Sequence, residues 1–96
     1  MSVPMLLVIE DDQNLSKLLE YNLVRAGFKC NISGSGEDGL EQLSANNFDL
    51  VLLDIMLPGI SGFDVCRTIR QNQLHKDLPI ITVSYTHLTL PTNREV

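Results

Sequence analysis

Apolar residues along the chain alternate between short continuous runs and stretches with helical spacing. The runs at residues 5–9 and 48–54 are continuous and predict strands that are buried on both faces. A mixed run at residues 28–33 predicts a weaker strand nearer an edge, and Pro79 to Ile81 predicts the start of a fourth strand. Each run is separated from the next by a helical pattern or a polar loop.

Three helices are expected between these strands. The first carries a leucine stripe, expected to be core material, and should end at Gly27, where a helix C-cap belongs. Ser35 is placed to cap the second helix, with Leu40 and Leu43 facing inward. Ser61 and Asp64 match a capping box that opens the third helix. This third helix carries Phe63, Cys66 and Ile69.

The repeated order of strand and helix predicts the α/β class. Buried-type strands joined by helical crossovers form a parallel sheet with helices on both faces, a doubly wound arrangement. We expect four strands and three helices. In such sheets the ligand site lies beyond the carboxyl ends of the strands, near a switch in strand order.

Composition limits the chain to one small domain of 96 residues with 44% apolar residues. A net charge of −5 argues against DNA binding by this segment alone. The apolar run at residues 5–9 is too short to span a membrane and lacks the flanks of a signal peptide, so we expect a cytoplasmic protein. Cys30 and Cys66 lack metal-ligand spacing and are expected to be reduced, half-buried thiols.

Carboxylates follow two of the buried strands: Glu10, Asp11 and Asp12 after the first, and Asp54 at the end of the third. If these strands are neighbours, the acids meet at one edge, where each close pair costs about 4 kcal/mol at about 4 Å and an effective dielectric of roughly 20. Such a cluster must take up protons or recruit a cation, and oxygen ligands favour Mg²⁺ or Mn²⁺. Asp11 or Asp12 can instead cap the first helix, although capping leaves Asp54 unexplained.

Three tracts carry a resemblance to a known family. They are Leu-Leu-Val-Ile-Glu-Asp-Asp at residues 6–12, Asp-Leu-Val-Leu-Leu-Asp-Ile-Met-Leu-Pro-Gly-Ile-Ser-Gly at residues 49–62, and Leu-Pro-Ile-Ile at residues 78–81. The chain resembles the flavodoxin-like receiver domains of two-component response regulators over residues 3–81. The sequence of the second tract is most similar to that of the subfamily with a winged-helix DNA-binding domain, which includes the phosphate-regulon regulator.

The resemblance implies a role for several residues. Asp54 would accept a phosphoryl group from a sensor histidine kinase. Asp11, the Asp54 carboxylate and the Met56 backbone carbonyl would bind Mg²⁺ or Mn²⁺, with Glu10 assisting through water and Asp12 less central. Pro58 and Gly59 would shape the adjacent loop.

The implied function is signal transduction by phosphorelay. The receiver would not be an enzyme, although it would assist its own phosphorylation and dephosphorylation. It would control an attached transcriptional output domain, which alone would contact DNA.

The chain departs from the family after residue 82. Ser84 falls at the position of the family's switch hydroxyl, but no strand ending in the family's Lys follows. Val83 to Thr92 resemble a translation of a transposon adapter used in DNA library preparation, GTC TCT TAT ACA CAT CTG ACG CTG CCG ACG. We therefore expect a truncated receiver at residues 1–82 and a non-native tail at residues 83–96. Ser84 is then not credited as the switch, and the family's dimer surface would lie in the missing part.

Other readings of the residues remain. Gly34, Gly36 and Gly39 spell a dinucleotide-binding fingerprint, but a permissive turn before a helix accounts for them better. A haloacid-dehalogenase-type phosphatase needs an Asp where Met56 stands, and His75 is expected to be a solvated loop residue. A receiver-like interaction module without phosphorylation, a metal-dependent phosphoryl-transfer enzyme and a non-functional fragment stay as alternatives.

Overall fold

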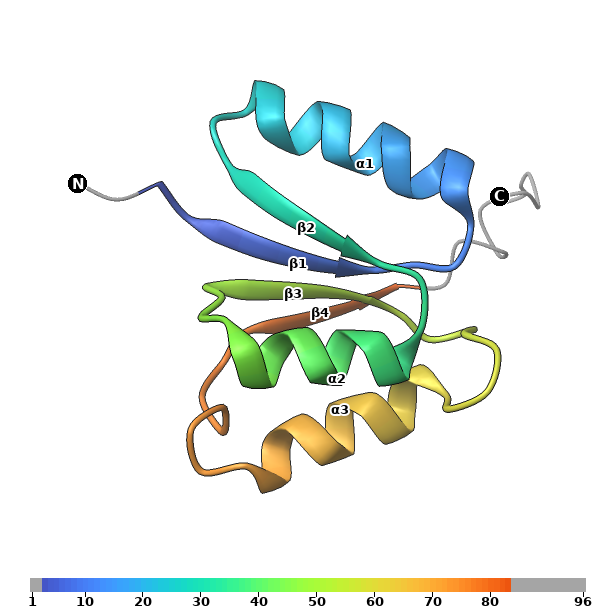
Figure 1. Cartoon of the computed structure of the whole chain (residues 1–96), viewed down its shortest axis with the longest axis vertical. Coiled ribbons are helices and arrows are strands. Elements are labelled where there is room, and N and C mark those ends of the chain that lie inside the picture. The colour runs from blue at the N-terminus through green and yellow to red at the C-terminus, as the bar shows by residue number, and fades with distance from the viewer. Residues whose placement is uncertain (1–2, 84–96) are drawn as a thin grey trace, which may run out of the picture.

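The computed structural model describes residues 3–83, and these form four strands and three helices as the sequence predicts. In chain order the elements are β1 (Met5–Ile9), α1 (Gln13–Arg25), β2 (Lys29–Ser33), α2 (Gly36–Ala45), β3 (Leu50–Asp54), α3 (Gly62–Gln71) and β4 (Ile80–Val83). Strand and helix alternate throughout this part of the chain (Figure 1). None of the described helices is long and apolar enough to cross a membrane.

The strands form one parallel sheet in the order β2-β1-β3-β4. α1 lies over one face, and α2 and α3 cover the other, which confirms the doubly wound parallel sheet (Figure 1). Ile9 pairs with Leu53, so β1 and β3 end side by side. β4 continues two residues past Ile81, and Val83 pairs with Asp54.

The core lies between the sheet and the pair α2 and α3. Its buried members come from β1, α2, β3, α3 and the loops next to them: Leu7, Ile9, Leu43, Phe48, Val51, Leu53, Leu57, Val65 and Ile69. Of the apolar residues expected on the third helix, Ile69 is buried and Cys66 is half-buried, whereas Phe63 is 65% exposed. Val65 completes the buried face of α3 in its place.

The leucine stripe of α1 was expected to be core material, and the structure buries it only in part. Leu15, Leu19 and Leu23 are half-buried, Leu18 is 56% exposed, and Ser16 is the one buried residue of the helix. Within the described residues α1 lies alone on its face of the sheet and packs mainly over β2, so no second helix covers its flank (Figure 1).

The helix ends follow their sequence signals closely. Gly27 adopts a left-handed φ of 101° after the last turn of α1, and the Phe28 N–H donates to the Leu23 carbonyl at 3.0 Å. The hydroxyl of Ser35 accepts from the Asp38 N–H, and the hydroxyl of Ser61 accepts from the Asp64 N–H. The predicted caps are therefore confirmed.

Of the three glycines at residues 34–39, Gly34 lies exposed in the bend before α2, whereas the other two serve helix packing. Gly36 and Gly39 lie inside α2 and are buried. A Cβ at Gly36 would meet the Val65 side chain at 2.5 Å, and one at Gly39 would collide with the Ile9 side chain. The interpretation as a permissive turn is thus wrong for these two positions, because they let α2 approach α3 and β1 closely.

Residues of β1 and of α1 are buried to different extents, so their substitution should affect the stability of the fold differently. Leu7 is fully buried in β1, so we expect Leu7→Ala to lower the free energy of unfolding by about 2–5 kcal/mol. Leu18→Ala on α1 should change it by less than about 0.5 kcal/mol, because that side chain is mostly in water. Urea denaturation followed by circular dichroism measures both, and equal losses would contradict the assignment of the core.

Candidate metal centre

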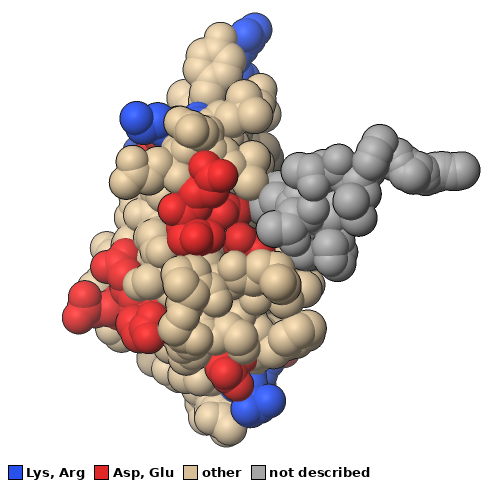
Figure 2. Space-filling model, turned by 90° about the vertical axis from the view of Figure 1, so that its right-hand side faces the viewer, with Lys and Arg blue, Asp and Glu red and all other residues tan. Residues whose placement is uncertain are grey.

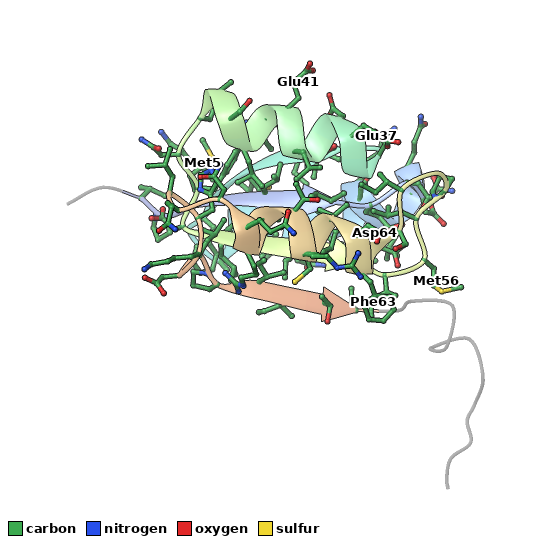
Figure 3. The ribbon with its side chains drawn as sticks, turned by 90° about the horizontal axis from the view of Figure 1, so that it is seen from below. Met5, Glu37, Glu41, Met56, Phe63 and Asp64 are labelled. Carbon is green, nitrogen blue, oxygen red and sulfur yellow. The ribbon has the colours of Figure 1, made fainter. Side chains whose placement is uncertain are left out.

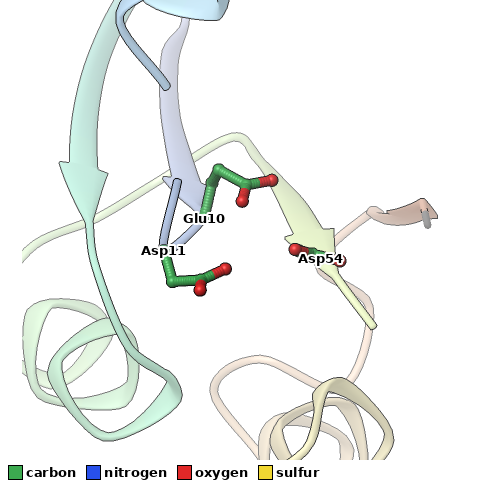
Figure 4. Close-up of side chains that lie close together, drawn as sticks. All are labelled: Glu10, Asp11 and Asp54. Atoms are coloured by element: carbon green, nitrogen blue, oxygen red, sulfur yellow. The ribbon is translucent and has the colours of Figure 1, made fainter. Parts of the chain in front are cut away.

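Three carboxylates converge at the carboxyl ends of β1 and β3. Glu10 and Asp11 directly follow β1, and Asp54 is the last residue of β3. One oxygen from each lies within 4.8 Å of the others (Figure 4). A view onto this end of the molecule shows acidic atoms gathered near its centre (Figure 2). The structure therefore brings together the acids that the sequence predicted to meet.

Asp54 is held in place by the chain that follows it. The residue is 6% exposed, and its Oδ1 accepts a hydrogen bond of 2.9 Å from the Met56 N–H. The peptide after Asp54 is fixed by β4, because the Ile55 N–H donates to the Val83 carbonyl at 2.9 Å. Strand pairing and this short turn together set the direction of the carboxylate.

Glu10 is the most buried acid of the cluster, with 3% of its surface exposed. Its Oε2 accepts from the Asp12 N–H at 3.0 Å, whereas its Oε1 is buried without any hydrogen-bond partner. Burial raises the pKa of Glu10 to about 7; the Asp12 N–H opposes this rise, and the nearby charge of Asp54 adds to it. A buried carboxylate oxygen without a partner is costly unless a proton or a cation meets it.

The sequence left open whether Asp11 or Asp12 caps the first helix, and the structure distinguishes the two residues. Asp12 is the N-cap of α1, and its Oδ1 accepts from the Asn14 N–H at 2.9 Å and from the Leu15 N–H at 3.1 Å. Asp11 is exposed and contributes an oxygen to the cluster. The metal-binding roles expected for the two residues stay predictions.

The residues present fit a hard divalent cation. All three side chains offer carboxylate oxygens, and neither sulfur nor imidazole takes part. The unpartnered Oε1 of Glu10 and the closeness of the like charges are what a bound cation would relieve. Mg²⁺ and Mn²⁺ match such a donor set.

The loop between β3 and α3 borders the cluster. Gly59 has a left-handed φ of 72° there, which agrees with a part in shaping the loop beside Pro58. The Met56 side chain is 55% exposed and, like Phe63, lies at this end of the molecule (Figure 3). Ser84 lies outside the described residues.

Gly62 is a residue that the sequence did not single out for the site. A Cβ there would lie 2.6 Å from the Asp54 carbonyl oxygen and 2.6 Å from the Ile55 Cα. The first turn of α3 therefore rests directly on the peptide that follows Asp54. The one signal in the sequence was a glycine just inside a helix start, next to its capping serine.

His75 lies in the loop before β4, away from the acids. It was expected to be solvated, but it is half-buried beside a groove of about 570 Å³ between the loops before β3 and β4. The Arg70 Nη1 donates to the carbonyls of His75, Lys76 and Leu78 at 3.2, 3.0 and 2.6 Å. The residue is thus part of a fixed loop, and it contributes nothing to the cluster.

The fold and the acid cluster define a class of protein, and sequence comparison identifies the same class. Residues 6–96 match the family model described as the response regulator receiver domain, and the chain belongs to this family. The match runs through the tract expected to be non-native. The boundary expected after residue 82 stays a prediction.

Individual relatives support the assignment. The chain is 43% identical over 79 residues to the response regulator ArlR of Staphylococcus saprophyticus, covering 82% of this chain and 34% of that protein. It is 48% identical over 82 residues to the transcriptional regulatory protein AfsQ1 of Streptomyces coelicolor, covering 85% of this chain and 35% of that protein. The chain thus spans about a third of the length of these curated relatives.

Solved structures show the same fold. The response regulator TrrA of Thermotoga maritima in complex with Mg(2+)-BeF is 36% identical, with a TM-score of 0.82 over 86% of this chain and 70% of that one. A putative response regulator from Chloroflexus aurantiacus is 37% identical, with a TM-score of 0.82 over 84% of this chain and 66% of that one.

The different positions of Asp11 and Asp12 can be separated by mutation. Asp11→Ala should weaken Mg²⁺ binding by more than about tenfold, since even partners outside the first coordination shell contribute that much. Asp12→Ala should lower the free energy of unfolding by about 1 kcal/mol through loss of the cap and leave Mg²⁺ affinity nearly unchanged. Titration calorimetry and urea denaturation report the two quantities, and an equal loss of affinity in both variants would contradict the assignment.

Mg²⁺ affinity should depend on pH through Glu10. Its pKa is raised from 4.5 to about 7, so its contribution to stability without metal is full below its unfolded pKa and is lost as pH rises through about 7. Metal binding favours the charged carboxylate, so affinity should rise about tenfold between about pH 6 and about pH 8.

The matched control is Glu10→Gln, which keeps the shape of the side chain and removes its titration. Calorimetric titrations of this variant should show a much flatter dependence on pH. The same slope in both proteins would assign the dependence to another group.

Proposed function

We propose that Asp54 accepts a phosphoryl group from the phosphohistidine of a sensor histidine kinase, with a Mg²⁺ or Mn²⁺ ion held beside it. The observation that carries the proposal is the convergence of Asp54 with Glu10 and Asp11 at the carboxyl edge of the sheet. Membership in the receiver family of two-component response regulators supports the phosphorelay role. The Mg(2+)-BeF complex of the Thermotoga relative supports the choice of metal.

The chemistry follows from how Asp54 is held. The Met56 N–H holds one oxygen of the carboxylate, so the second oxygen is presented to the incoming phosphorus. This oxygen forms a bond to phosphorus while the bond from phosphorus to the histidine nitrogen breaks, which leaves an aspartyl phosphate and a histidine that takes up a proton. When bound, the metal supplies the positive charge that lets two anions approach each other.

The other residues of the site act on binding rather than on the reacting bond. Asp11 and the Met56 carbonyl would hold the metal directly, and Glu10 would hold it through water. Pro58 and Gly59 would keep the loop in place. In this scheme the chain is a phosphoacceptor that assists its own phosphorylation and dephosphorylation, and is not an enzyme acting on separate substrates.

We propose that the phosphorylated receiver controls transcription through its output domain. We also propose that the protein is cytoplasmic. The relative from Streptomyces coelicolor is described as a transcriptional regulatory protein, and the chain matches about a third of its length. The resemblance to the winged-helix subfamily supports a DNA-binding output domain attached to the receiver, with DNA contacted through that domain. We also propose that residues 83–96 come from an adapter sequence, which sequencing the source DNA across these codons decides.

Replacement of the acceptor tests the function. Asp54→Asn keeps the size of the side chain but removes its nucleophilic charge, so Mg²⁺-dependent labelling by a small acyl phosphate or by a phosphorylated histidine kinase should fall to background. Asp77→Asn is the matched control, because Asp77 is an exposed acid of the loop before β4 and lies outside the cluster.

Both variants should be assayed in the 96-residue chain and in the reading frame recovered from source DNA. Undiminished labelling of Asp54→Asn would refute the assignment of Asp54 as the residue that accepts the phosphoryl group. A wild-type protein that folds and binds Mg²⁺ but takes no label would favour an interaction module without phosphorylation.

A further inference from the structure

The first turn of α3 is seated on the backbone of the acceptor aspartate through a single residue without a side chain. At Gly62 an added Cβ would meet the Asp54 carbonyl oxygen at 2.6 Å, the Ile55 Cα at 2.6 Å and the Asp54 carbonyl carbon at 3.1 Å. All three are backbone atoms of the sheet end. They cannot rotate away, so any side chain at position 62 must displace α3 or the turn after β3.

Other close glycines of the fold differ in this respect. A Cβ at Gly36 would meet the methyl groups of Val65 and Ile60 most closely, and one at Gly39 would meet the side chain of Ile9. Such side-chain atoms can yield by changing rotamer. Gly62 is thus the glycine of these three whose substitution acts directly on the backbone beside the acid cluster.

The contact at Gly62 closes the loop that carries Met56. The Gly62 N–H donates to the Ile55 carbonyl at 3.1 Å, and the Ile55 N–H donates to the Val83 carbonyl at 2.9 Å. Between these anchors the Met56 N–H donates to the Asp54 Oδ1 at 2.9 Å. The position of the Met56 backbone relative to the carboxylate therefore depends on how closely α3 approaches.

We infer that Gly62 is a positioning residue of the acid site, which holds the Met56 backbone against the Asp54 carboxylate and thereby sets the affinity for a divalent cation. The inference rests on the proposed function for the identity of the cation. The hydrogen bond between Met56 and Asp54 belongs to the protein alone and can be followed without metal.

The experiment compares Gly62→Ala with Gly39→Ala in the full 96-residue chain, because a Cβ at Gly39 would meet the Ile9 side chain and neither α3 nor the loop that carries Met56. Both substitutions should lower the melting temperature. Gly62→Ala should in addition weaken Mg²⁺ binding by about tenfold or more, the size of effect typical of residues that orient metal ligands. Gly39→Ala should keep an affinity close to that of the wild type, measured by calorimetry on each folded protein. Equal affinities in the two variants would overturn the inference.

Amide hydrogen exchange of the wild-type chain without metal gives a second measurement, which remains decisive if Gly62→Ala fails to fold. The Met56 and Gly62 amides should be protected to similar degrees, because one local opening releases both. Exchange of the Met56 amide at the rate of an unprotected loop, with Gly62 still protected, would overturn the positioning role. Failure of the wild type to bind Mg²⁺ would refute the proposed metal site and the effect of Gly62 on affinity, while amide exchange would still decide whether Gly62 positions Met56.

Discussion

The parallel pairing of β1 with β3 is the constraint on which the site depends. Because Ile9 lies beside Leu53, the residues that follow these strands emerge together at one edge of the sheet. The sequence then places Glu10 and Asp54 there, both nearly removed from water. A buried apolar sheet thus forces like charges together, and the free energy of packing holds them against their repulsion. The resulting demand for a cation or a proton is the chemical basis of the receiver site.

Much of this arrangement could be predicted from the sequence because its signals are local. Continuous apolar runs identified β1 and β3, and serine caps and Gly27 marked helix ends, since each of these patterns stabilises the structure of its own segment. The convergence of Asp11 with Asp54 needed one further assumption, that the first and third strands are neighbours. The division of labour between Asp11 and Asp12 came only from the family resemblance, because adjacent acids after a strand look alike until the helix start is fixed.

The failures came from contacts between distant segments. Leucines at helical spacing indicated a core face for α1, yet burial depends on what covers the helix, and most of these leucines are only half-buried because α1 has no neighbouring helix on its face among residues 3–83. Gly36 and Gly39 looked like residues of a turn and Gly62 like part of a helix start, whereas each marks a close approach to another element. A glycine that is needed for its backbone conformation and one that is needed for its small size are the same letter in a sequence.

Asp12 links α1 to the acid cluster through two different groups. Its carboxylate caps the helix, and its N–H donates to Glu10. Fraying of the first turn of α1 would therefore loosen a hydrogen bond to a buried acid that lies outside the helix. The start of this helix and the most buried acid of the cluster are thus joined through one residue, which acts on the helix with its side chain and on Glu10 with its backbone.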